Sequence, residues 1–79
     1  MNAEYIKTMI EAGLPGANVQ VSGDDGVHFE AVVISDAFAG KNMLQQHRMV
    51  YDTLGNQMQA GEIHALALRT YSQQQWDER

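Results

Sequence analysis

The sequence predicts a small α+β domain in the order αββ(αα)βα, with a three-stranded mixed sheet covered by helices. Two patterns support this prediction: apolar residues recur at helical spacing in residues 2–13 and 42–58, and they alternate or run together in three short stretches between them and after them. The 79 residues leave room for one modest core, because chains of this size bury about 60% of their unfolded surface. We therefore expect residues 1–79 to form a single domain.

The N-terminal part is expected to form a helix and then an edge strand. Asn2 is a suitable N-cap, and the helix ends at Gly13, which offers a left-handed cap. Its apolar face consists of Tyr5, Ile6, Met9 and Ile10. Val19 and Val21 then alternate with polar residues, as in a half-buried edge strand, and residues 23–26, Gly-Asp-Asp-Gly, are expected to form a tight turn.

Residues 28–35 are expected to form the central strand, because apolar side chains fall on both of its faces. Asp36 can act as a cap before the loop of residues 37–41. The helical pattern that follows in residues 42–58 can be broken near Leu44. Its apolar face is expected to contain Met43, His47, Val50, Tyr51, Leu54 and Met58.

Residues 61–70, GEIHALALRT, contain a run that is apolar on both faces, as expected of a covered strand in a parallel pairing. A helical crossover of about 25 residues leads to it, and such crossovers join parallel strands, which start at the same edge of a sheet. His28 and His64, each at the start of its strand, are therefore expected to lie side by side. The alternative for His64 is a simple hydrogen bond to a neighbouring loop. Residues 72–79 are expected to form a short final helix held by Trp76.

The composition excludes several classes of function. The chain has no cysteine, so it has no disulfide, no thiolate metal site of its own and no cysteine nucleophile. No apolar run approaches the length of about 18 residues that a membrane span needs, and we expect a cytoplasmic protein. The net charge of −5 argues against non-specific binding of nucleic acid. No triad order, P-loop or dinucleotide fingerprint occurs, so we expect no catalytic residues and no enzyme.

Two imidazoles at one rim can bind zinc, copper or iron, but a stable site needs three or four ligands. Asp24 or Asp25 could complete such a site, although aspartates in turns more often serve the turn itself. A partner could complete it instead. An iron-sulfur cluster takes four ligands, usually thiolates, and accepts two histidines on one iron in Rieske-type centres. A chain with histidines and no cysteine fits a partner that supplies the sulfur.

Three segments carry a resemblance: HFEAVVISDAFAGK at residues 28–41, QHRMVY at residues 46–51 and EIHALAL at residues 62–68. Together they resemble the BolA-like protein family. The short acidic turn before His28 and the C-terminal Trp76, which is followed by charged residues, resemble the IbaG (YrbA) branch of this family most of all. The resemblance covers residues 18–79 and implies a three-stranded fold related to the type II KH domain, in agreement with the order predicted above. Relatives commonly carry arginine where this chain has Gln46, which weakens a basic-surface role for this position.

The resemblance also implies a partner and a cofactor. BolA-like proteins pair with monothiol CGFS glutaredoxins and share a two-iron two-sulfur cluster, with glutathione supplied on the partner side. The histidine of the IHA motif matches His64, and the second ligand, from the loop between the first two strands, matches His28. The implied function is a non-enzymatic adaptor in iron-sulfur cluster trafficking or iron sensing, monomeric or weakly dimeric when alone.

A rival function is transcriptional regulation, which is also described for BolA-like proteins. A helix-turn-helix unit within residues 42–58 could bind DNA, whereas the two GXXG matches, at residues 13–16 and 23–26, precede the wrong elements for a KH-type clamp. The candidate contacts with a partner or nucleic acid are Phe38, Gly40, Lys41, Arg48 and Arg69. The alternative for two of them is structural: Phe38 fills the core and Gly40 permits a turn. His47 is expected to be a packing residue.

Overall fold

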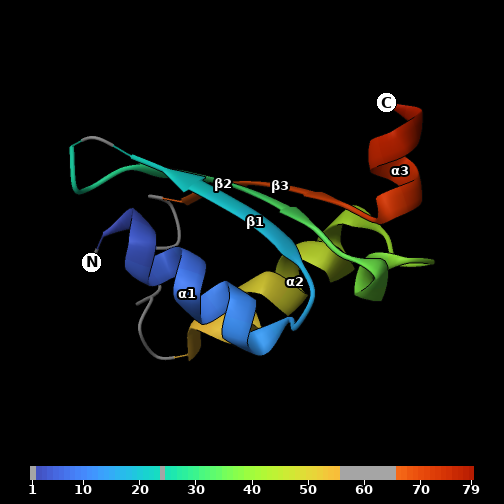
Figure 1. Cartoon of the computed structure of the whole chain (residues 1–79), viewed down its shortest axis with the longest axis horizontal. Helices are drawn as coiled ribbons and strands as arrows, with labels where there is room; N and C mark the ends of the chain where they lie inside the picture. The colour runs from blue at the N-terminus through green and yellow to red at the C-terminus, as the bar shows by residue number, and fades with distance from the viewer. Residues whose placement is uncertain (1, 24, 56–65) are drawn as a thin grey trace.

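The computed structural model describes residues 2–23, 25–55 and 66–79, and within them the helices and strands follow the predicted order (Figure 1). In chain order they are α1 (Ala3–Gly13), β1 (Asn18–Ser22), β2 (Phe29–Ile34), the 3₁₀ helix η1 (Asp36–Phe38), α2 (Met43–Leu54), β3 (Leu66–Tyr71) and α3 (Gln73–Glu78). The predicted α+β class is confirmed. None of the helices in these ranges is long and apolar enough to cross a membrane.

The three strands form one mixed sheet in the order β1-β2-β3. β1 pairs antiparallel with β2, and β2 pairs parallel with β3, so that Phe29 lies opposite Leu66. The predicted central position of β2 and its parallel pairing with β3 are both confirmed. As a result, the N-terminal ends of β2 and β3 lie at the same edge of the sheet.

Helices α1 and α2 cover one face of this sheet, and the core lies between them (Figure 1). The largest fully buried apolar side chains are those of Phe38, Ile6, Ile10, Leu54, Val33 and Val50. The sheet residues in this core, such as Val19, Ala31, Val33 and Leu66, occupy alternate positions of their strands, as expected when one face of a sheet is buried.

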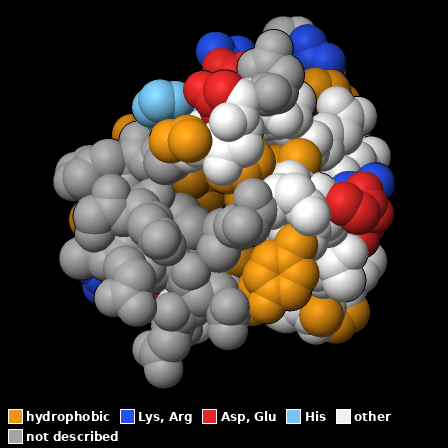
Figure 2. Space-filling model, turned by 90° about the vertical axis from the view of Figure 1, so that its left-hand side faces the viewer, with side chains coloured by type: hydrophobic (Ala, Val, Ile, Leu, Met, Phe, Trp, Pro, Cys, Tyr) orange, Lys and Arg blue, Asp and Glu red, His pale blue; other side chains and the backbone are white. Residues whose placement is uncertain are grey.

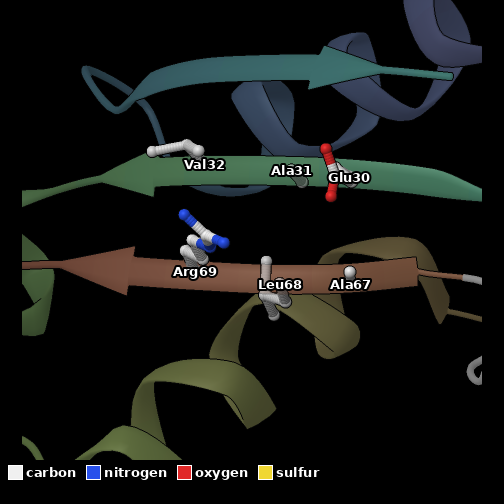
Figure 3. Close-up of a pocket in the computed structure, with 6 residues that line it drawn as sticks. All are labelled: Glu30, Ala31, Val32, Ala67, Leu68 and Arg69. Carbon is white, nitrogen blue, oxygen red and sulfur yellow. The ribbon is translucent and has the colours of Figure 1, made fainter.

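The opposite face of the sheet is largely open, which corrects the prediction that the third strand is covered on both sides. Ala67 and Arg69 are exposed, because among the described helices none forms a second layer over β3, and α3 makes only a few contacts with this strand. A groove of about 160 Å³ lies along β2 and β3, and Figure 3 shows the Arg69 side chain extending from β3 toward β2.

The helix α1 begins as predicted, because the Asn2 side chain accepts a hydrogen bond of 2.8 Å from the Tyr5 amide. Its end differs from the prediction: Gly13 is the last helical residue, and the left-handed conformation belongs to Gly16, with φ of 85°. A Cβ atom at Gly13 would lie 2.5 Å from Cγ2 of Thr53, so this glycine allows α1 to approach α2 closely.

The connection from β2 to α2 also corrects a prediction. Ser35, not Asp36, caps η1, and Asn42 caps α2 through a reciprocal pair of hydrogen bonds with Gln45. The predicted break near Leu44 is wrong, because α2 runs continuously from Met43 to Leu54.

The buried face of α2 is formed by Gln46, Val50 and Leu54, while Met43 and Leu44 are exposed. The prediction that placed Met43 on the apolar face is therefore wrong. Met58, which was predicted on the same face, lies outside the described residues.

The final helix α3 forms as predicted and is held at the end of β3. Ser72 and Gln75 make a capping box, and the Trp76 ring packs edge-on against Tyr71 with ring centroids 5.2 Å apart. The guanidinium of Arg79 lies 3.5 Å from the centre of the Trp76 ring. Aromatic packing and capping together fix this short helix, which would be unstable alone.

Candidate functional site

The loop of residues 23–28 connects β1 to β2 and carries the first predicted ligand. It is longer than the tight turn predicted for residues 23–26, and His28 is its last residue, immediately before β2 starts at Phe29. A Cβ atom at Gly23 would lie 2.6 Å from the carbonyl oxygen of His28, and Gly26 has φ of 72°. Both glycines are thus required by the path of the loop. Asp24 lies outside the described residues.

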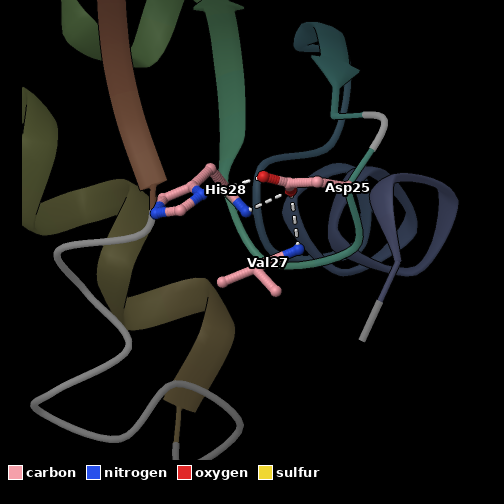
Figure 4. A network of polar contacts seen from close by, with 3 residues as sticks. All are labelled: Asp25, Val27 and His28. Atoms are coloured by element: carbon pink, nitrogen blue, oxygen red, sulfur yellow. Dashed lines mark hydrogen bonds and ion pairs between the residues drawn. The ribbon is translucent and has the colours of Figure 1, made fainter.

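Asp25 organises this loop through both of its carboxylate oxygens (Figure 4). Oδ1 accepts hydrogen bonds from the backbone amides of Val27, at 2.9 Å, and His28, at 2.7 Å. Oδ2 lies 2.9 Å from Nδ1 of the His28 ring. The side-chain hydrogen bond with His28, followed by the two backbone hydrogen bonds, holds the pKa of the Asp25 carboxyl well below its usual range.

The His28 ring is available to a partner. Its side chain is 76% exposed, and its Nδ1 atom faces Asp25, whereas no hydrogen bond joins Nε2 to any residue in the ranges 2–23, 25–55 and 66–79. Figure 4 shows Nδ1 of the ring facing Asp25 and the opposite side of the ring lying toward the strand β3, and the pairing of Phe29 with Leu66 puts the starts of the two strands together. Figure 2 views the molecule from the left-hand side of Figure 1 and shows apolar side chains on this surface.

The second predicted ligand, His64, lies outside the described residues, and so does the predicted juxtaposition of His28 with His64. The parallel pairing on which that prediction depends is confirmed, since β2 and β3 start at one edge. In the sequence, His64 precedes the first residue of β3, Leu66, by two positions.

The predicted contact residues do not form one surface. Phe38 is fully buried in the core. This corrects the prediction that Phe38 contacts a partner or nucleic acid, and it agrees with the alternative that Phe38 fills the core. Gly40 takes a left-handed conformation with φ of 77° next to the exposed Lys41. Arg48 is exposed on α2, which packs on the covered face of the sheet, whereas Arg69 lies at the open face. The structure therefore does not bring Arg48 and Arg69 together.

Gln46 is a buried polar residue for which the sequence analysis predicted no structural role. Its side chain is 2% exposed, and it accepts a hydrogen bond of 2.8 Å from the Thr70 hydroxyl. Its amide nitrogen lies within hydrogen-bond distance of three oxygens: Lys41 O at 2.9 Å, Gln75 Oε1 at 3.1 Å and Phe38 O at 3.3 Å. The signal in the sequence was its spacing of four residues from Val50, which puts both on one helix face.

The described part of the chain contains no group of three or more histidine, aspartate or glutamate side chains placed to hold a metal ion. In the described loop, His28 faces Asp25, and the Asp25 carboxylate is already engaged by the backbone of the loop. The arrangement suits one imidazole ligand of a site that is completed by other residues or by another molecule.

Comparison with known proteins agrees with this fold. The family model described as BolA-like protein matches residues 10–75. A solved structure of a BolA protein homologue from Coxiella burnetii is 44% identical and superposes with a TM-score of 0.82, covering 98% of this chain and 97% of that one.

Two relatives are similar in sequence. An uncharacterized protein from the rpoN-murA intergenic region of Acinetobacter guillouiae is 32% identical over 76 residues, which are 96% of this chain and 90% of that protein. The DNA-binding transcriptional regulator BolA of Escherichia coli (strain K12) is 44% identical over 50 residues, 63% of this chain and 47% of its own length. From the family match, these relatives and the shared fold, we conclude that this chain belongs to the BolA-like protein family.

Proposed function

We propose that this protein is a non-enzymatic adaptor that shares a two-iron two-sulfur cluster with a monothiol CGFS glutaredoxin, with His28 and His64 as its ligands. The observation that carries the proposal is the exposed His28 ring, which turns Nδ1 to Asp25 at the edge where β2 and β3 begin and so leaves Nε2 as the nitrogen for a ligand bond. The resemblance of the IHA motif and of the loop histidine to the ligands of BolA-like proteins supports the same pair.

The donor chemistry of this edge fits such a cluster. Neutral imidazole is a suitable ligand for iron, and metal-bound histidines usually donate their other ring N–H to a carboxylate, as His28 is placed to do toward Asp25. When bound, the cluster supplies iron atoms whose remaining ligands come from the partner. With no cysteine in the chain, the sulfur ligands have to come from the glutaredoxin and its glutathione.

The test is a titration of this protein into cluster-loaded CGFS glutaredoxin with glutathione present, followed by visible absorption and circular dichroism. We expect a new spectrum at one-to-one stoichiometry. His64→Ala should abolish it, and His28→Ala should shift or weaken it, because each removes one imidazole ligand.

His47→Ala is the matched control, because His47 is a half-buried residue of α2 and is not part of the loop of residues 23–28. It should leave the cluster spectrum unchanged, and far-ultraviolet circular dichroism should show that all variants remain folded. An unchanged spectrum in both His28→Ala and His64→Ala would refute histidine ligation.

DNA binding is the second candidate, favoured by one observation: the Escherichia coli relative is named a DNA-binding transcriptional regulator. Against it stand the net charge of −5 and the placement of Arg48 and Arg69 on different sides of the sheet. A DNA-binding assay at several salt concentrations separates the two candidates, because neutralising phosphates makes affinity fall steeply with salt. A lack of salt-dependent binding would remove this candidate.

A further inference from the structure

The two oxygens of the Asp25 carboxylate have different roles. Oδ1 accepts hydrogen bonds from the backbone amides of Val27 and His28 and so fixes the carboxylate to the loop. Oδ2 lies 2.9 Å from Nδ1 of His28. An ionised carboxylate is only an acceptor, so the nitrogen that faces it must carry the proton. In a neutral imidazole the other nitrogen, Nε2, then keeps its lone pair.

We propose that Asp25 is a positioning residue for His28: it holds the ring in the Nδ1–H tautomer and thereby presents the Nε2 lone pair for binding to a metal. Only the metal-binding step rests on the proposed function, since the tautomer is a property of this chain alone. Asp25 is thus assigned to orienting the ligand and not to binding the metal itself.

The geometry explains why a positioning residue is useful here. The His28 side chain is 76% exposed, so packing does not restrict its rotation. The Asp25 carboxylate is 50% exposed, but its position does not depend on side-chain packing, because the two amide hydrogen bonds hold it. Gly23 and Gly26 in turn keep the loop in this path. The backbone of the loop therefore sets the direction of the open nitrogen.

Asp25→Asn is the variant that separates tautomer from loop structure. The asparagine oxygen can still accept the hydrogen bonds from the two backbone amides. Its NH₂ group takes the place of Oδ2 and donates a hydrogen bond to Nδ1, so that the ring proton moves to Nε2. Long-range ¹H–¹⁵N correlation spectra, recorded at a pH where the ¹⁵N signals show a neutral ring, report which ring nitrogen of His28 is protonated. We expect Nδ1–H in the wild type and Nε2–H in Asp25→Asn. Asp36→Asn, an exposed aspartate outside the loop, is the control and should leave the Nδ1–H tautomer in place.

The second measurement is the affinity for cluster-loaded CGFS glutaredoxin, which Asp25→Asn should lower by about 10- to 100-fold, the usual effect of losing the partner of a metal-bound histidine. The same tautomer in wild type and Asp25→Asn overturns the positioning role. A changed tautomer with unchanged affinity overturns its link to metal binding. If the wild type forms no shared cluster, the proposed function and the metal-binding step fail together, while the spectra of the two chains still decide whether Asp25 sets the tautomer.

Discussion

Asp25 is exposed to solvent, and yet three hydrogen bonds reach its carboxylate. They lower its pKa because they stabilise the ionised form, the bond with the His28 side chain most of all. A carboxyl with a lowered pKa contributes stability that is present above the unfolded value, about 3.9, and is lost as the pH falls through the folded value. The loop contacts of Asp25 should therefore persist well into the acid range.

We predict that Asp25 stays ionised as the pH is lowered through about 3.9, the ordinary value for an aspartate. In His28→Ala the largest cause of the shift is absent, so the pKa of Asp25 should rise toward the ordinary value. The measurement is a ¹³C NMR titration of the Asp25 carboxyl carbon in both chains. A midpoint near 3.9 in the wild type would show that the loop hydrogen bonds do not form in solution.

At the scale of elements, the Gln46 side chain connects four parts of the chain: the loop after η1, the helix α2 that carries it, the strand β3 through Thr70, and the helix α3 through Gln75. Gln75 Oε1 also accepts a hydrogen bond from the backbone amide of Ser72, which caps α3. The Ser72 amide and the Gln46 side chain therefore donate to the same oxygen. The amide of Gln46 therefore links the C-terminal helix to the core.

We predict that Gln46→Met lowers the free energy of unfolding by about 1–3 kcal/mol or more, because methionine fills the volume but leaves buried oxygens and a hydroxyl without partners. Denaturant unfolding measures this change. Gln74→Met is the matched control, since the Gln74 side chain is exposed on α3 and its replacement should stay within about 0.5 kcal/mol of the wild type. Equal effects of the two substitutions would mean that the buried network adds nothing to stability.

At the scale of the whole molecule, one layer of helices on one face of the sheet supports a single core. Domains have stabilities of about 0.05–0.15 kcal/mol per residue, so about 4–12 kcal/mol is expected for 79 residues. Phe38 has the largest fully buried side chain of the described chain, although it lies in a short 3₁₀ helix between β2 and α2. A large part of the total stability therefore depends on this residue.

We predict that Phe38→Ala lowers the free energy of unfolding by about 3–5 kcal/mol, the usual cost of the cavity left by a phenylalanine. Met43→Ala, at an exposed position of α2, should change it by no more than about 0.5 kcal/mol. Urea unfolding of both variants provides the comparison. A Phe38→Ala protein with full stability and weakened binding to the glutaredoxin would instead make Phe38 a contact residue.

The sequence by itself determined the kinds of elements, their order and the pairing of the sheet. Helix and strand periodicity depend on neighbours close along the chain, and Asn2 and Trp76 act locally as predicted. The length of the crossover between β2 and β3 was enough to predict a parallel pair, because such a connection spans the sheet and returns in the same direction. The motifs also identified the BolA-like family without any coordinates.

Only the tertiary structure decided which polar and small residues are buried or in close contact. Gln46 is buried because Thr70 and Gln75, distant in sequence, meet its amide. Gly13 is required by Thr53, a residue of another helix, and not by a left-handed cap. Ala67 and Arg69 are exposed because the described helices α1 and α2 pack on the other face of the sheet, which periodicity along one strand cannot report.

In the candidate site, too, some features could be predicted from the sequence and others depend on the tertiary structure. Two histidines at strand starts were visible in the sequence, but the bond from His28 to Asp25 depends on the backbone path of the loop, which brings a ring nitrogen to 2.9 Å from a carboxylate. Hydrogen-bond geometry of this kind is set by three-dimensional positions to within a few tenths of an ångström. Residue types and their spacing therefore predicted which side chains to consider, and the fold decided which nitrogen of His28 faces Asp25.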